Sequence, residues 1–311
     1  MTKLRHKLKG QLLALRMTKV DTIIFVEGTE NDPIFYEVIA QRYSAETGRA
    51  VQVRLADELP NALPQRKRGG SGGKRTLVRA ALFLEKWRGT GAARLLQGKE
   101  IAFCADKDVD DLLGKLDNCP AVVYTPMHSA ENHIVVDSNL HQAICCAIST
   151  TAHSLNNEIT DCNRLRFLSH HWKEWVVFCL VSLKLGLTKS GNYGQESLFN
   201  NPAHAPADLT AAKLKFDEVK KTSGIPSVQF DAEVQAVTSL IDNLIANDRF
   251  DEVFKGKWYI SVFYSLLDAS VTLGPRCRAC GKNGLWIGIR SAFAPEERLY
   301  RHYANAFAGL R

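Results

Sequence analysis

Acidic residues follow two apolar segments of the sequence at points where strands are predicted to end. Glu27 comes directly after TIIFV and Asp106 ends EIAFCAD, with Asp108 and Asp110 close behind. Ligands of a parallel α/β sheet collect beyond the carboxyl ends of its strands, so we expect these carboxylates to share one edge. Carboxylate oxygens suit a hard cation, and the pattern predicts a site for Mg²⁺, with Mn²⁺ as a substitute.

The residue after Glu27 is a glycine, and this favours a site that receives a phosphate. Gly28 has no Cβ, so backbone and ligand can approach closely there. Acids are also common in turns after strands, and an Asp-x-Asp pair arises by chance in many proteins. Solvated turns are therefore the alternative interpretation of the same residues.

The glycine-rich segment GGSGGKRT (69–76) matches a nucleotide-binding loop only in part. The G-x-x-x-x-G-K-[ST] frame requires glycine at 68 and Ser or Thr at 75, and arginine stands at both positions. ATP binding is therefore not predicted. Lys74 and Arg75 are instead candidates to hold a substrate phosphate near the acids, with a solvated loop as the alternative.

Cys277 and Cys280 have the C-x-x-C spacing of a zinc site. A structural zinc needs four ligands, and no second pair of this kind follows, although His302 lies downstream. The alternative is a turn that carries two free thiols. Most other cysteines lie among apolar residues, where a reduced thiol acts as a small hydrophobe, as is typical of a cytoplasmic protein.

The elements that would position these residues alternate in the first half of the chain. Short apolar strands are predicted at 22–26, 51–56, 100–106 and 121–125, and helices at 32–44 and 77–87. This order predicts an α/β protein with a mainly parallel sheet and helices on both faces. Helical periodicity dominates the second half.

Composition narrows the class of protein. Hydrophobic residues make up 45% and charged residues 23% of the chain, as in ordinary globular proteins. The formal net charge of +7 favours a polyanionic partner such as nucleic acid. No apolar run approaches the roughly 20 residues of a membrane span, so we expect no membrane contact. Residues 1–20 predict a basic amphipathic helix that packs its leucines on the protein itself, with RNA, a membrane surface or a partner as the alternatives.

The order of the motifs resembles the Toprim domain of topoisomerases, primases and OLD-type nucleases. The matching segments are FVEGTEND (25–32) and FCADKDVDD (103–111). TPMHSAENHIV (125–135) and FKGKWYISVF (254–263) are similar to later motifs of the AriB-like branch of this family, the effectors of PARIS anti-phage defence systems. The resemblance implies a Toprim domain at 21–136 and a helical domain at 137–311.

The resemblance also implies roles for individual residues. Glu27 matches the Toprim glutamate, a general acid/base or metal ligand, and Asp106 and Asp108 match the metal-binding aspartates. Glu131, oriented by Asn132, or else Asp110 completes the site. The implied activity is Mg²⁺-dependent cleavage of RNA, and of tRNA in particular, by a dimer that an ABC-type ATPase controls.

Two further functions stay open on the sequence alone. One is a regulatory module that binds nucleic acid or the ATPase without chemistry, which the retained acids argue against. The other is a DNA-directed Toprim nuclease, since the basic balance does not distinguish RNA from DNA. A primase or topoisomerase is disfavoured, because neither a zinc ribbon nor a nucleophilic tyrosine is evident at the motif positions.

Overall fold

The structure is a computed structural model that describes residues 17–28, 31–58, 73–88, 98–158, 171–187 and 203–310. Most of the predicted N-terminal helix and the start of the glycine-rich segment lie outside these residues. The chain divides into two compact units. Unit 1 comprises Met1–Lys107, Gly114–Pro126 and Ala294–Arg311, and unit 2 comprises Asp108–Leu113 and Met127–Phe293.

Unit 1 is built on a four-stranded parallel sheet with the order β2-β1-β3-β4. Its strands are β1 (Thr22–Val26), β2 (Val51–Leu55), β3 (Glu100–Ala105) and β4 (Val122–Tyr124). Every residue of β1 and β3 is buried, as expected for central strands that are covered on both faces. The α/β class and the parallel sheet predicted from the sequence are confirmed.

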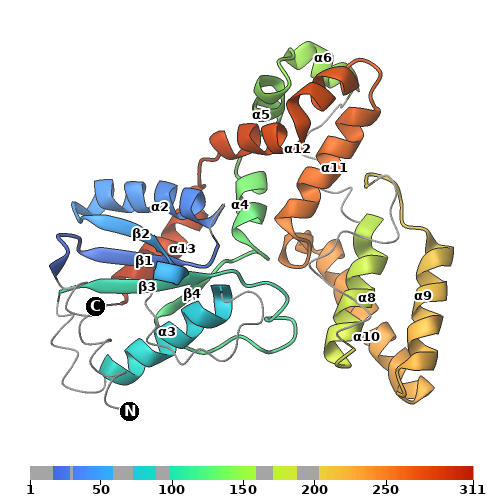
Figure 1. Ribbon diagram of the computed structural model, residues 1–311, viewed down its shortest axis with the longest axis horizontal. Coiled ribbons are helices and arrows are strands. Elements are labelled where there is room, and N and C mark those ends of the chain that lie inside the picture. The colour runs from blue at the N-terminus through green and yellow to red at the C-terminus, as the bar shows by residue number, and fades with distance from the viewer. Residues whose placement is uncertain are drawn as a thin grey trace. The chain divides into compact units, whose positions relative to one another are not determined.

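Helices cover both faces of this sheet (Figure 1). α2 (Asp32–Thr47) crosses from β1 to β2, and α3 (Gly73–Arg88) precedes β3. Pro33 in the first turn and Gly48 at the end bound α2, because proline suits a helix start and Gly48 adopts the left-handed φ of 69° that closes the helix.

The C-terminal helix α13 (Glu297–Ala308) belongs to unit 1 and packs on α2 and β3. Its buried side chains follow helical spacing: Leu299, Tyr300, Tyr303, Ala304 and Phe307. The division thus differs from the predicted domains in three places. The sheet unit ends at Pro126 rather than 136, residues 108–113 belong to the helical unit, and residues 294–311 join the sheet unit instead of the helical domain. The cause is the aromatic face of α13, which completes the core above the sheet.

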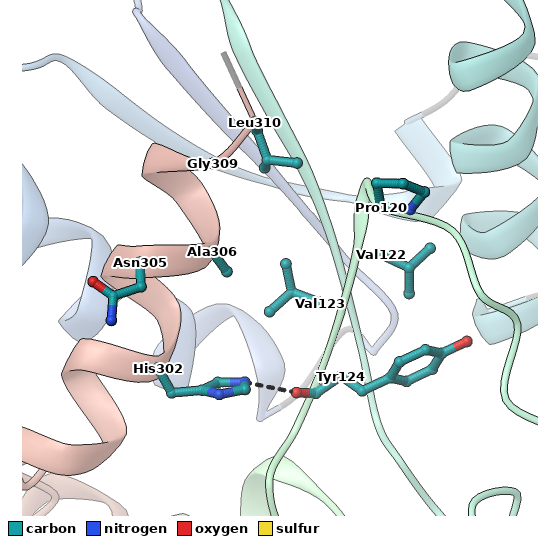
Figure 2. A pocket seen from close by; sticks show the side chains of 9 residues that line it. All are labelled: Pro120, Val122, Val123, Tyr124, His302, Asn305, Ala306, Gly309 and Leu310. Carbon is teal, nitrogen blue, oxygen red and sulfur yellow. Dashed lines mark hydrogen bonds between the residues drawn. The ribbon is translucent and has the colours of Figure 1, made fainter.

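Helix α13 also forms a shallow pocket with the edge strand β4, shown in Figure 2. The pocket has a volume of about 350 Å³ and is lined largely by apolar groups. His302 Nε2 donates to the carbonyl oxygen of Tyr124 over 3.0 Å. This bond fastens α13 to β4.

Unit 2 is helical, as predicted for the second half. Its helices are α4 (Ala130–Val136), α5 (Leu140–Ala147), α6 (Ala152–Glu158), α8 (Lys173–Lys184), α9 (Leu209–Thr222), α10 (Ser227–Ala246), α11 (Gly256–Ala269) and α12 (Gly274–Ser291), with a 3₁₀ turn η4 (Phe250–Glu252) before α11. Among the described residues, no helix is long and apolar enough to cross a membrane.

The two cysteines with C-x-x-C spacing lie on α12 rather than in a turn. Gly281, at φ 71°, interrupts the helix directly after them. Both thiols are free, and Cys277 is buried. Burial raises the pKa of Cys277 to about 11, so its thiol stays protonated at neutral pH.

Candidate functional site

Two of the predicted acids lie at the same edge of the sheet in unit 1. Glu27 directly follows β1 and Asp106 directly follows β3. These strands are neighbours, and their register pairs Val26 with Cys104. Parallel strands end at a common edge, so both side chains stand on the carboxyl side of the sheet, where ligands of α/β proteins bind.

The side chain of Glu27 meets the first residue of α3. A Cβ placed on Gly73 would lie only 2.6 Å from Glu27 Cγ, so this position admits no side chain. The N-terminus of a helix carries a partial positive charge, which stabilises a nearby carboxylate. The close approach explains how a half-buried glutamate is tolerated directly after a buried strand.

The helix that supplies this N-terminus starts earlier than the sequence predicted. α3 begins at Gly73 rather than at residue 77, so Lys74 and Arg75 lie in its first turn and not in a loop. Lys74 Nζ donates to the carbonyl oxygen of Lys107 over 3.2 Å and lies 5.8 Å from the ring of Tyr124. The ammonium group of Lys74 therefore reaches the segment directly after Asp106, whereas Arg75 is exposed.

A further acid, Asp32, lies in the first turn of α2 and was not among the predicted site residues. Its carboxylate is buried and accepts the backbone N–H of Gly28 over 2.7 Å. A Cβ on Gly28 would lie 3.1 Å from Asp32 Oδ2, so the glycine leaves room for this carboxylate. The signal was an aspartate before proline at a predicted helix start.

A pair of buried tyrosines lies beneath these acids. The hydroxyl groups of Tyr36 and Tyr303 are 3.4 Å apart. Burial raises the pKa of both phenols well above its ordinary value, and the charges of Asp106 and Asp32 raise it further. Both hydroxyls stay protonated at neutral pH, so neither provides a tyrosinate nucleophile.

The remaining predicted acids lie in unit 2. Asp108 adopts a left-handed φ of 53°, which is strained for a residue with a side chain. Its backbone N–H donates to the carbonyl oxygen of His128 over 2.8 Å, and its Oδ1 lies 3.9 Å from His128 Nδ1. Asp110 is half-exposed in the same turn. The strain at Asp108 is of the kind found at functional sites.

Glu131 occupies the first turn of α4 and is buried. Its Oε1 lies 3.4 Å from Nζ of Lys257, a residue at the start of α11 that was not among the predicted site residues. A Cβ on the preceding Gly256 would lie 2.4 Å from the carbonyl carbon of Glu131, so glycine is required there. The starts of α4 and α11 are thus in direct contact.

The oxygen donors fit a magnesium ion in chemistry but are not gathered as a complete ligand set. Mg²⁺ is usually held by one or two carboxylates, with water and substrate phosphate as further ligands. Glu27 and Asp106 place two carboxylates at one edge of the sheet. Within the described part of the chain, no three His, Cys, Asp or Glu side chains come together as metal ligands, at the acids or around Cys277.

Comparison with known proteins adds no relative. No protein-family model, no curated protein and no solved structure matches this chain. The described residues define an α/β protein with a four-stranded parallel sheet and a helical unit, most of which, Met127–Phe293, is inserted between β4 and α13.

Proposed function

We propose that this chain is a Mg²⁺-dependent nuclease of the Toprim type, similar to the AriB-like effectors of PARIS defence systems. The observation that carries the proposal is the placement of Glu27 and Asp106 directly after neighbouring parallel strands. The start of α3, with Lys74, lies at the same edge. Acids beside a lysine suit a phosphodiester, because they provide for both proton transfer and phosphate binding.

Each residue has a part in the proposed hydrolysis. A magnesium ion held by Glu27 and Asp106 would supply charge that polarises the scissile phosphate. The carboxylate of Glu27 would also accept a proton from the attacking water. The ammonium group of Lys74 would contact a non-bridging phosphate oxygen, as a compact point charge does. Arg75, in the same helical turn, would extend this contact along the nucleic-acid strand.

The proposal extends to the substrate and the partners of the protein. The net charge of +7 favours a nucleic acid. We take RNA, and tRNA in particular, as the substrate from the resemblance. An ABC-type ATPase as the controlling partner, a homodimer as the active form and a cytoplasmic location complete the proposal. The helical unit would supply the contact surfaces.

The test is cleavage of total cellular RNA and of plasmid DNA in Mg²⁺, Mn²⁺ or EDTA. The variant is Glu27→Gln, which keeps the shape of the side chain. Glu37→Gln is the matched control, because Glu37 is exposed on α2. We expect metal-dependent cutting by the wild type and the control, and a loss of at least about 100-fold in Glu27→Gln. Equal cutting by all three proteins would refute the assignment of Glu27.

A non-catalytic module that binds nucleic acid or the ATPase is the second candidate. The observation that favours it is that the described residues assemble no group of three metal-ligating side chains. This module would bind RNA with the same affinity in the wild type and in Glu27→Gln, and neither protein would cut, with or without the ATPase. Cutting of plasmid DNA alone would instead establish the DNA-directed nuclease.

A further inference from the structure

A single buried amide joins two distant segments of unit 2. Asn132 has no exposed surface and uses all of its hydrogen-bonding capacity. Its Oδ1 accepts from Ser129 Oγ over 2.8 Å and from the backbone N–H of Gly256 over 2.9 Å. Its Nδ2 donates to the carbonyl oxygens of Asp251, over 3.2 Å, and Phe254, over 2.7 Å. Because two partners are carbonyl oxygens and one is an N–H group, this orientation of the amide is the only one that satisfies them.

The segment that Asn132 holds is itself fixed on several sides. The carbonyl oxygen of Asp251 also accepts the backbone N–H of His128 over 2.9 Å. Its carboxylate accepts the hydroxyl of Tyr259 over 2.6 Å. His128 in turn accepts the backbone N–H of Asp108. One hydrogen-bonded network therefore connects the strained turn of Asp108, the start of α4 and the start of α11.

The network also determines how far apart the side chains of Glu131 and Lys257 lie, although neither side chain is part of it. Glu131 precedes Asn132, and Lys257 follows Gly256. Their charged groups lie 3.4 Å apart. Lys257 is 64% exposed, so this ion pair alone is too weak to hold two helix starts together. The buried amide and the close backbone contact at Gly256 must do so.

We propose that Asn132 is a positioning residue, which fixes residues 251–256 to the start of α4 and thereby places Lys257 against Glu131. The catalytic part of this inference is that Glu131 belongs to the active site, as the resemblance implies, and this part rests on the proposed nuclease function. The positional part depends only on the hydrogen bonds of Asn132. The two parts are tested by different readouts on the full chain.

The first variant is Asn132→Asp, which keeps the size and an acceptor oxygen but removes both donors to the carbonyl oxygens. The matched control is Asn139→Asp. Asn139 caps α5 by accepting the backbone N–H of Gln142, and aspartate performs that role equally well. Hydrogen exchange of residues 252–258 should become at least about tenfold faster in Asn132→Asp and remain unchanged in the control.

Cleavage kinetics form the second readout, measured well below the unfolding temperature so that loss of folded protein does not contribute. We expect kcat of Asn132→Asp to fall about 10- to 100-fold with little change in KM, as a displaced catalytic group would cause. Faster exchange with an unchanged kcat would overturn the catalytic role. Unchanged exchange would overturn the positional role. A wild type that cuts no nucleic acid, with or without the ATPase, would overturn the proposed function, while the exchange result would still decide the positional role.

A second variant guards against misfolding of Asn132→Asp. Gly256→Ala introduces no charge, but its methyl group would meet the backbone of residues 131 and 132 at 2.4–2.5 Å and push the two segments apart. Gly309→Ala is the control, because a Cβ there meets only ordinary contacts at 3.5 Å. Gly256→Ala should reproduce the fast exchange and the loss of kcat, and wild-type behaviour in both readouts would contradict the proposal.

Discussion

Glu100 lies at the amino end of β3, opposite the edge that carries Glu27 and Asp106, and we predict that its carboxylate stabilises the fold. Glu100 starts β3 and is 1% exposed. Its carboxylate binds Arg49 Nη1 over 2.8 Å and the hydroxyl of Thr22 over 2.8 Å, with Tyr43 at 3.4 Å. Replacing it with glutamine removes the charge and leaves the shape in place. We expect Glu100→Gln to destabilise the fold.

The size of the effect follows from the exposure of the two partners. Breaking a buried ion pair costs about 3–5 kcal/mol, because the remaining charge is left uncompensated. Arg49 retains 22% of its side-chain exposure and can turn towards water, so Glu100→Gln should cost about 3 kcal/mol, near the lower end. Arg49→Met should cost more, about 4–5 kcal/mol, since the carboxylate of Glu100 has no comparable access to water.

Urea unfolding at pH 7, monitored by circular dichroism, measures both variants. A loss of 3 kcal/mol corresponds to a decrease in Tm of about 6–12 °C for a domain of this size. The double variant Glu100→Gln, Arg49→Met should recover part of the lost stability, because no unpaired charge remains. Two single variants that both lie within about 1 kcal/mol of the wild type would refute the reasoning, as would a larger loss for Glu100→Gln than for Arg49→Met.

Two other predictions concern the carboxyl edge and the C-terminal helix. Gly73→Ala should displace the side chain of Glu27 and reduce cleavage at least about tenfold. The change in Tm should be small, because alanine favours the helix. Unchanged cleavage would contradict the contact between Gly73 and Glu27. Glu297 bonds Arg42 and Arg301, which lower its pKa. Its contribution to stability is therefore present at neutral pH and lost as the pH falls through that lowered pKa, and Glu297→Gln should show a smaller loss of stability between pH 7 and pH 3 in urea unfolding.

The sequence by itself determined the elements that depend on local pattern. Apart from Thr22 and Glu100 at their first positions, the buried strands β1 and β3 are apolar, so each was predicted within one residue of its observed end. The acids after these strands follow directly from the order of residues. Helical periodicity likewise predicted the character of unit 2. These features need only neighbours along the chain, because propensity and burial pattern act over a few residues.

The tertiary structure decided what depends on contacts between distant segments. In the sequence, α13 has the pattern of any amphipathic helix, and only the structure shows that its Tyr303 lies beside Tyr36. The resemblance implied that Asn132 orients Glu131, whereas in the structure its amide binds a segment more than 100 residues away. A hydrogen bond or a close backbone contact leaves no periodic signal in the sequence, because its partner can lie at any separation, and only folding brings the two together.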